Sequence, residues 1–482
     1  MKATLEAFRR PVAAQTRQRL AAAWARVPAP LRTPRQFLGR QYAGCGATIG
    51  AMPRCDFACR GCYLGEDANR VPPASLDAVK RQLARLREWL GEGGNVQLTD
   101  GELTLRPEAE LIELIRHARA LGLVPMLMTH GDTFRRRPGL LERLMIEGGL
   151  TELSVHIDTT QRGRRDYREA RREDELAPLR AEFAELIRQA RCRTGRRLEV
   201  ATTVTVTRDN LDGVAHIIRW LVANAGAFKM VSFQPVAPVG RTQAELEGVS
   251  ATELWERIAE GLYGDRAAAV RLAAHEGWLG HPACSRFVQG VVVRQPGAGP
   301  AFHPLLHPDE PRDRALLDGW LARFGGLTLR LDRPARALAR LAGVIATDPA
   351  FVLGRVLPFL LDWPRRLDPA RPWRLVARRL FRRARVDYLN IVSHHFMGRV
   401  ELGTPLGRER LALCVFKAPV DGELVSMCEL NALGGRDRYY ERLRGATPVA
   451  REERQHDQDP RDAGRPGRLH RRVDRVLRDV LR

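Results

Sequence analysis

Three cysteines lie close together near the start of this chain. Cys55, Cys59 and Cys62 are spaced C-x3-C-x2-C in the stretch CDFACRGCYLG. Clustered thiols in a reducing compartment indicate a metal centre rather than disulfides. A structural zinc site would need a fourth ligand, which Cys45 could supply. An iron–sulfur cluster held by three thiolates leaves one iron open to another ligand, so the spacing alone is compatible with both centres.

The overall composition is typical of a globular protein. The chain has 482 residues, of which 44% are hydrophobic, and this length favours two or more structural units. The sequence shows no apolar run long enough to cross a membrane and no signal peptide at its start. We therefore expect the protein in the cytoplasm.

The charge is strongly basic. Lysine and arginine total 79 residues against 57 acidic residues, which gives a net charge of +22, and nearly all of the basic residues are arginine. A nucleic acid or an anionic membrane surface could explain the excess. Solvent-exposed arginines explain it more simply, because no zinc-finger, RNA-recognition or helix-turn-helix pattern accompanies the charge.

Strands and helices are predicted to alternate between residues 47 and 238. Apolar residues at helical spacing predict the helices, and shorter apolar runs between them predict the strands. Such alternation indicates a parallel sheet covered by helices, either a partial barrel or a doubly wound sheet. The predicted strands are 47–54, 95–102, 124–131, 150–160, 198–207 and 229–238, with helices over 75–93, 106–123, 137–149, 177–195 and 210–226.

The predicted strands carry polar residues on one face. Ser154, His156 and Asp158 alternate with apolar residues in one strand, and Thr203 and Thr205 do so in the next. A parallel strand covered on both faces should be apolar throughout, and burying polar groups without partners is costly. We therefore expect these side chains to line a lumen that holds a polar ligand.

The cysteine loop and its place before the helix–strand units resemble the radical S-adenosylmethionine (radical SAM) superfamily. The resemblance covers about residues 40–240. It implies an α/β fold, a partial (β/α)6 TIM-like barrel in which the loop follows the first strand. It also implies that Cys55, Cys59 and Cys62 hold a [4Fe–4S] cluster.

The resemblance assigns further residues to S-adenosyl-L-methionine (SAM). In the superfamily a glycine-rich turn after the second strand binds the methionine amino group, and TDGE places Asp100, Gly101 and Glu102 there. Glycine lets the backbone approach the ligand closely, so we expect Gly101→Val to weaken SAM binding and to spare the cluster. Polar residues of the fourth and fifth strands are implied to contact SAM, here Ser154, His156, Asp158, Thr203 and Thr205.

Three positions depart from the family pattern. Gly61 stands where an aromatic residue usually lies near adenine, and we expect Tyr63 to take over this contact. Asp100 replaces the first glycine of the turn, and Leu103 replaces the proline that usually follows it. These departures concern the details of SAM contact and not the cluster.

The resemblance implies a radical enzyme. The reduced cluster would cleave SAM to a 5′-deoxyadenosyl radical that abstracts hydrogen from the substrate, with the electron coming from a donor such as flavodoxin or ferredoxin. Peptide, lipid, nucleoside and RNA substrates occur in the superfamily, and a lipid or a peptide is our working expectation. The alternative is a non-catalytic basic protein, stabilised by zinc or an iron–sulfur cluster, that binds nucleic acid or a membrane surface.

The chain divides by composition into four segments. We assign 1–40 to a basic amphipathic extension, 41–245 to the radical SAM core and 246–445 to a largely helical accessory or substrate region. A polar tail, predicted to be disordered before a short terminal helix, covers 446–482. Within 311–385, apolar and arginine-rich helices predict either a lid over the barrel, which we favour, or a membrane-surface segment.

The remaining cysteines identify no further site by their pattern. Cys284 and Cys428 are the candidates for a catalytic residue, and Cys414 has no predicted role. Isolated cysteines are most often small buried hydrophobic residues. Family members with accessory clusters generally show dense cysteine runs near the C-terminus, and this chain shows none. A second cluster is therefore not expected.

Overall fold

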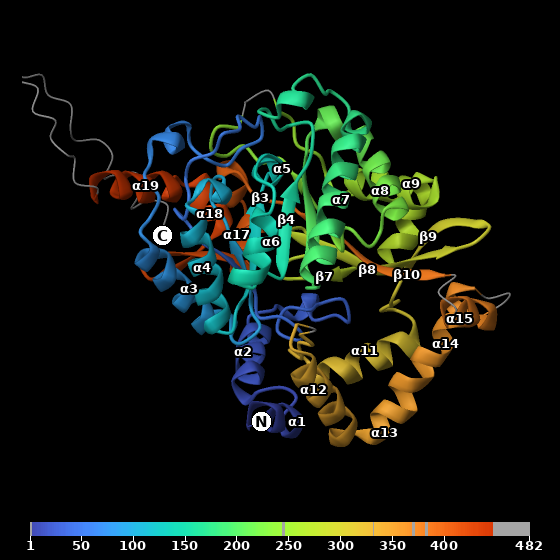
Figure 1. Ribbon diagram of the computed structural model, residues 1–482. Helices are drawn as coiled ribbons and strands as arrows, with labels where there is room; N and C mark the ends of the chain where they lie inside the picture. Colours follow the sequence, from blue (N-terminus) through green and yellow to red (C-terminus); the bar gives the residue numbers. More distant parts are fainter. Residues whose placement is uncertain (1, 243–245, 331, 369–371, 381–383, 447–482) are drawn as a thin grey trace, which may run out of the picture. The chain divides into compact units, whose positions relative to one another are not determined.

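One sheet runs through the part of the chain that the structure describes. The computed structural model describes residues 2–446 except 243–245, 331, 369–371 and 381–383, and its strands form a twelve-stranded sheet. Six parallel strands in chain order make the centre of the sheet, as predicted for a partial barrel (Figure 1). They are β1 (Cys45–Ala47), β2 (Asn95–Leu98), β3 (Val124–Thr129), β4 (Glu152–His156), β5 (Glu199–Val206) and β6 (Met230–Pro235).

The connecting helices bury their apolar faces against this sheet. In α3 the Ser75 hydroxyl accepts a hydrogen bond from the Ala78 amide at 3.2 Å, which begins the helix, and Gly91 follows its last turn with φ of 82°. Leu83 and Leu86 of α3 are fully buried in the main hydrophobic core. The connecting helices are α3 (Leu76–Leu90), α4 (Glu108–Ala120), α5 (Asp132–Arg136), α6 (Leu140–Arg143), α7 (Ala177–Thr194) and α8 (Val214–Ala223).

The first strand is shorter and begins earlier than predicted. It spans Cys45–Ala47 instead of residues 47–54. Gly50 has φ of 70°, a conformation that turns the chain away from the sheet, and its amide donates to the Asp100 carboxylate. Residues 48–54 thus form the connection that leads to Cys55.

The C-terminal region adds strands that the sequence did not predict. β10 (Arg385–His394) pairs in parallel with β6, and β11 (Phe416–Val420) pairs in parallel with β1. The six central strands therefore have a C-terminal neighbour on each side. Outside them lie the antiparallel strands β7 (Gly277–Trp278), β8 (Ser285–Gln295), β9 (Ala298–Pro304) and β12 (Glu423–Ser426).

The predicted helical character of the segment that begins at residue 311 is confirmed for its described residues up to 380, and β10 follows where the prediction still placed helix. Figure 1 shows these helices as a group in gold and orange, away from the helices that connect the central strands. They are α11 (Pro311–Phe324), α12 (Pro334–Thr347), α13 (Pro349–Phe351), α14 (Leu357–Leu367) and α15 (Pro372–Leu380). Before the sheet come α1 (Lys2–Arg9) and α2 (Ala14–Ala25), and the other helices are α9 (Ala251–Tyr263), α10 (Ala269–Ala273), α16 (Arg399–Leu402), α17 (Pro405–Ala412), α18 (Met427–Ala432) and α19 (Gly435–Ala446).

All described residues belong to one compact unit that ends at Ala446. The tail predicted to be disordered, with its terminal helix, lies outside the described residues from 447 onward. Among the described helices, none is by itself long and apolar enough to span a membrane. α12 and the segment Pro349–Leu367 reach the required hydropathy only together, and a bend of 94° separates them.

Candidate active site

A cavity of about 200 Å³ lies at the carboxyl ends of the central strands. This is the edge at which parallel sheets covered by helices bind their ligands. The loop with Cys55, Cys59 and Cys62 lines the cavity. So do all but one of the residues that the resemblance assigns to SAM, namely Tyr63, Asp100, Gly101, Glu102, Ser154, His156, Thr203 and Thr205. Their contact with SAM stays a prediction, but the structure brings them together.

The polar face of β4 and β5 points into this cavity as expected. The hydroxyls of Ser154 and Thr203 lie 2.9 Å apart, and the Nε2 atom of His156 lies 3.1 Å from the Thr205 hydroxyl. The alternating Leu153 and Val155 are buried in the main core instead. Gln234 of β6, which flanks Phe233 and was expected on the polar face, also lines the cavity. The sequence pattern did not identify Gln97, Thr99 and Thr129 on the same wall, because short strands carry too few positions to show a period.

Asp158 does not line the cavity. β4 ends at His156, so the two-residue period does not continue to position 158. The buried Asp158 carboxylate accepts hydrogen bonds from the amides of Thr205, at 2.7 Å, and Thr160, at 2.8 Å. It also lies 2.7 Å from the His156 Nε2 atom. Asp158 therefore fixes the ends of β4 and β5 and the His156 ring, and it does not contact the cavity directly.

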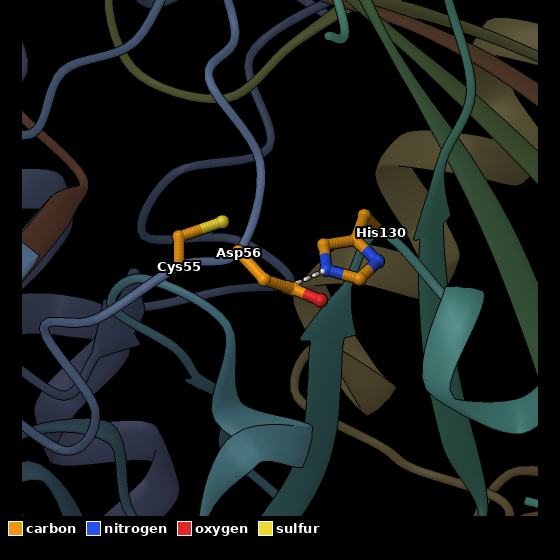
Figure 2. A group of neighbouring side chains, drawn as sticks. All are labelled: Cys55, Asp56 and His130. Atoms are coloured by element: carbon orange, nitrogen blue, oxygen red, sulfur yellow. Dashed lines mark hydrogen bonds and ion pairs between the residues drawn. The ribbon is translucent and has the colours of Figure 1, made fainter. Parts of the chain in front are cut away.

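The cysteine loop is held by the residues between its thiols. The Phe57 ring stacks on His130 with 3.8 Å between ring centroids, and a Cβ atom on Gly163 would lie 2.5 Å from the Phe57 ring. The Asp56 carboxylate bonds the His130 Nε2 atom at 2.8 Å and accepts from Arg136 at 2.7 Å. Figure 2 shows Asp56 and His130 facing each other beside Cys55. The end of β3 thus anchors the loop.

Cys55, Asp56 and His130 have ligand atoms within 4.8 Å of one another, which is a spacing that a metal ion could use. The hydrogen bond from His130 lowers the pKa of Asp56, although burial opposes the shift. The carboxylate is thus charged, and it is already engaged by the His130 ring and by the Arg136 guanidinium. We therefore interpret Asp56 and His130 as anchors of the loop.

The three thiols face a cation that the sequence gave no reason to select. Burial raises the pKa of Cys55 to about 12 and that of Cys59 well above its usual value. Burial tends to lower the pKa of Arg241, but the nearby thiols raise it overall. The Arg241 guanidinium also donates to the Phe57 carbonyl at 3.4 Å. Buried thiols beside a cation lose their protons when a metal supplies further positive charge.

The TDGE turn packs on the residues that precede Cys55. The amide of Gly101 donates to Met52 and that of Glu102 to Arg54, both at 2.7 Å. A Cβ atom on Gly101 would lie 2.4 Å from the Arg54 carbonyl oxygen, so only glycine fits here. The buried Glu102 carboxylate accepts from the His130 amide at 2.8 Å and from the Thr129 hydroxyl at 2.6 Å. This carboxylate holds the turn in place.

Residues 49–221 match the sequence model of the Radical SAM superfamily. This chain contains a radical SAM domain. The match supports an enzyme, and the cysteine loop and the TDGE turn both lie within the matched residues. None of the curated proteins searched matches the chain.

Solved structures similar to this radical SAM protein are distant in sequence. SuiB from Streptococcus suis is 14% identical, with 53% of this chain and 51% of that chain covered and a TM-score of 0.34. A structure of anSMEcpe with bound AdoMet is 12% identical, with 46% of this chain and 59% of that chain covered and the same TM-score. The chain spans about half the length of the first of these structures.

The C-terminal region of the radical SAM protein contributes a charged anchor to the cavity. The buried Arg436 guanidinium, on α19, bonds the Asp100 carboxylate, which also accepts from the Tyr440 hydroxyl at 2.6 Å. Burial raises the pKa of Asp100, and Arg436 offsets part of that rise. The guanidinium lies 4.6 Å from the centroid of the Tyr63 ring, whose hydroxyl donates to the Asp100 carbonyl at 2.6 Å. Tyr63 therefore joins the cysteine loop to the turn.

The candidate thiols of the C-terminal region take different positions. Cys428 lines the cavity and its sulfur accepts from the Met397 amide at 3.4 Å, and burial raises its pKa to about 12. Cys284 does not line the cavity, and its sulfur accepts from Arg410 at 3.1 Å. The Cys414 thiol donates to the Phe416 carbonyl at 3.3 Å. Of the two predicted candidates, only Cys428 reaches the site of the radical SAM domain.

Cys45 is too far from the cysteine loop to complete a zinc site there. It begins β1, and its thiol lies 3.9 Å from the Asn95 side-chain oxygen at the start of β2. The loop with Cys55 follows the other end of the parallel strands. The zinc alternative therefore lacks the fourth ligand that the sequence offered.

Proposed function

We propose that this protein binds a [4Fe–4S] cluster through Cys55, Cys59 and Cys62 and binds SAM in the adjoining cavity. One observation carries the proposal: the three thiols and nearly all of the residues assigned to SAM by resemblance line the same cavity at the carboxyl ends of the strands. The donor set fits the cluster, because three soft thiolates face it and a neighbouring arginine balances their charge.

In this superfamily the bound cluster and SAM together supply a 5′-deoxyadenosyl radical that abstracts hydrogen from the substrate. The residues of this chain position and shield the reactants. The Asp100 and Glu102 carboxylates are already bonded to Arg436 and His130, so the turn offers its backbone to SAM rather than its acidic side chains. The hydroxyls of Ser154, Thr203 and Thr205 offer partners for the polar groups of the ligand.

The proposed substrate side of the cavity is the wall built by the C-terminal region. Phe396, Met397, Met427 and Cys428 give this wall an apolar character next to the polar strand ends. Such a wall suits a substrate with an apolar part, such as a lipid or an apolar peptide side chain. We further propose that the protein acts in the cytoplasm with a one-electron donor such as flavodoxin or ferredoxin.

Anaerobic reconstitution tests the cluster assignment. We expect Cys55→Ala, Cys59→Ala and Cys62→Ala each to lose iron and visible absorbance, while Cys192→Ala, on the exposed surface of α7, keeps both. The reduced native protein should slowly convert SAM to 5′-deoxyadenosine and methionine.

Cys45→Ala is the matched control against a zinc site. A zinc site completed by Cys45 predicts a colourless protein that loses its metal in Cys45→Ala. Full iron content in Cys59→Ala would contradict the cluster assignment.

A further inference from the structure

The helices after residue 330 expose a row of large apolar side chains. On α12, Leu338, Leu341 and Ile345 are 66%, 43% and 46% exposed. Their spacing of three and four residues places them on one face of the helix. Half of the exposed large apolar side chains in the described part of the chain lie between Leu329 and Val376. Such a concentration marks an interaction surface.

The same pattern continues after the bend that follows α12. Leu353, in the π-helical turn Val352–Val356, precedes Leu357, Leu360 and Leu361 of α14, and all four leucines are exposed. Their spacing again puts them on one helical face. We call the outward side chains of both helices the outer surface. Its members are Leu338, Leu341, Ile345, Leu353, Leu357, Leu360 and Leu361.

The inner face of α12 already makes the packing that the fold needs. Ala337 and Val344 are buried, and Val344 belongs to a small core with Phe324 and Phe351. A Cβ atom on Gly343 would lie 2.2 Å from the Phe8 carbonyl oxygen, so α1 packs closely on this side. The outer surface is therefore additional to the apolar face that holds α12 in place.

Charge on these helices favours an anionic partner. Arg355, Arg365 and Arg379 are exposed, and from residue 334 to residue 380 the sequence has more arginines than acidic residues. Other arginines of the segment face the protein: Arg340 lies beside Glu92, and Arg366 pairs with Asp313. Arg365 lies 3.6 Å from Asp362 of the same helix, but 59% of its side chain is exposed, so it is accessible to an anionic partner.

We propose that the outer surface docks on a lipid bilayer that carries anionic headgroups. Two helices joined at 94° present leucines outward and are accompanied by exposed arginines. Leucines on such helices enter the boundary between headgroups and acyl chains, and arginines bind the lipid phosphates. This arrangement places the helices on the membrane surface, because the inner face of α12 packs on Phe324 and Phe351 of the protein itself. This docking surface is separate from the cavity and does not depend on the proposed chemistry.

Flotation of the full-length protein with vesicles tests the proposal. The vesicles are phosphatidylcholine alone or an equal mixture of phosphatidylcholine and phosphatidylglycerol. We expect strong binding only to the mixture and a decrease in binding as salt is added, because salt screens the attraction of arginine to lipid phosphate.

Two pairs of substitutions separate the apolar and the charged contributions. Leu353→Glu with Leu360→Glu should weaken partitioning by more than about tenfold, since two inserted leucines are lost. Arg355→Glu with Arg365→Glu should remove the preference for anionic vesicles. Each lost arginine should weaken binding to these vesicles about fivefold. The matched controls are Val400→Glu with Leu406→Glu and Arg70→Glu with Arg171→Glu, at exposed positions outside the outer surface.

Three results would overturn the proposal. The first is equal flotation of native protein and both variant pairs. The second is binding that does not respond to phosphatidylglycerol. The third is a native protein that does not bind vesicles but self-associates in analytical ultracentrifugation, with Leu353→Glu and Leu360→Glu together abolishing the self-association. That result would assign the outer surface to a second copy of this chain.

Discussion

The ion pair between Arg436 and Asp100 should control the stability of the cavity wall. The two residues are 336 positions apart in the chain, both are buried, and the pair joins α19 to the turn beside the cysteine loop. We expect Arg436→Met to destabilise the protein and to weaken SAM binding while iron is retained. The reason is that the substitution leaves a buried carboxylate without its cation.

The magnitude follows from the contacts that are lost. Removing one partner of a buried pair costs about 3–5 kcal/mol. The interaction with the Tyr63 ring and the hydrogen bond to Asn431 at 2.9 Å are lost as well, at about 1 kcal/mol each. Burial raises the pKa of Asp100 and Arg436 opposes that rise, so loss of Arg436 shifts the carboxyl further toward its neutral form, which limits the cost. We therefore expect a loss of about 3 kcal/mol, and SAM affinity about tenfold lower.

A double-mutant cycle measures the pair itself. Native protein, Asp100→Asn, Arg436→Met and the double variant are compared by urea unfolding and by equilibrium dialysis of SAM, all with matched iron content. Asp100→Asn keeps an acceptor for Tyr440 and for the Gly50 amide. The double variant should therefore recover part of the loss, with a coupling energy of about 2–3 kcal/mol.

The control variant for this cycle is Arg438→Met, which removes an exposed arginine from the same helix. It should change neither the unfolding midpoint nor the affinity for SAM. Strict additivity of Asp100→Asn and Arg436→Met in both measurements would refute the reasoning, because the two side chains would then not stabilise each other.

Two further predictions concern the TDGE turn after β2 and the first residue of β4. Gly101→Ala should lower iron content as well as SAM affinity, because its Cβ atom would push against the Arg54 carbonyl beside the cysteine loop. The control is Gly299→Ala, whose Cβ atom meets nothing within 4 Å. Full iron content in the Gly101→Ala protein would contradict the prediction, since the loop would then tolerate the shift. Burial raises the pKa of Glu152 to about 7 from 4.5, so the folded protein holds this proton more tightly and loses stability as pH rises between those values. Glu152→Gln should remove about 1–3 kcal/mol of that pH-dependent loss of stability. Urea unfolding at pH values below and above this range measures it, and an equal loss of stability with pH in native protein and variant would contradict the prediction.

Local patterns in the sequence predicted the part of the site that the central strands carry. Ser154, Thr203 and Thr205 alternate with apolar residues because one face packs on helices and the other lines the cavity. Asp158 was assigned to the same face because the pattern does not show where β4 ends. The revised expectation for Gly101 has a similar cause, since only the structure shows the backbone of Arg54 against it.

Residues that act across long separations left no such pattern. Arg241 and Arg436 are two among many arginines. What distinguishes them is their surroundings, because Arg241 is half-buried beside the thiols and Arg436 is buried beside Asp100. β10 begins within an arginine-rich stretch of the sequence, which concealed its start, and β11 is only five residues long with a proline inside it. Pairing with β6 and β1 determines these strands more than their own composition does.

The pairing of β11 with β1 has a consequence for how the chain matures. During synthesis the first strand emerges early, but its outer edge stays open until residues 416–420 have left the ribosome. α19 reaches Asp100 later still. The half of the protein that contains the cysteine loop therefore cannot form the whole cavity lining without the C-terminal region. A nascent chain that ends before α19 would leave the Asp100 turn beside the cysteine loop without Arg436, so we expect the proposed loading of iron and sulfur to follow the synthesis of α19.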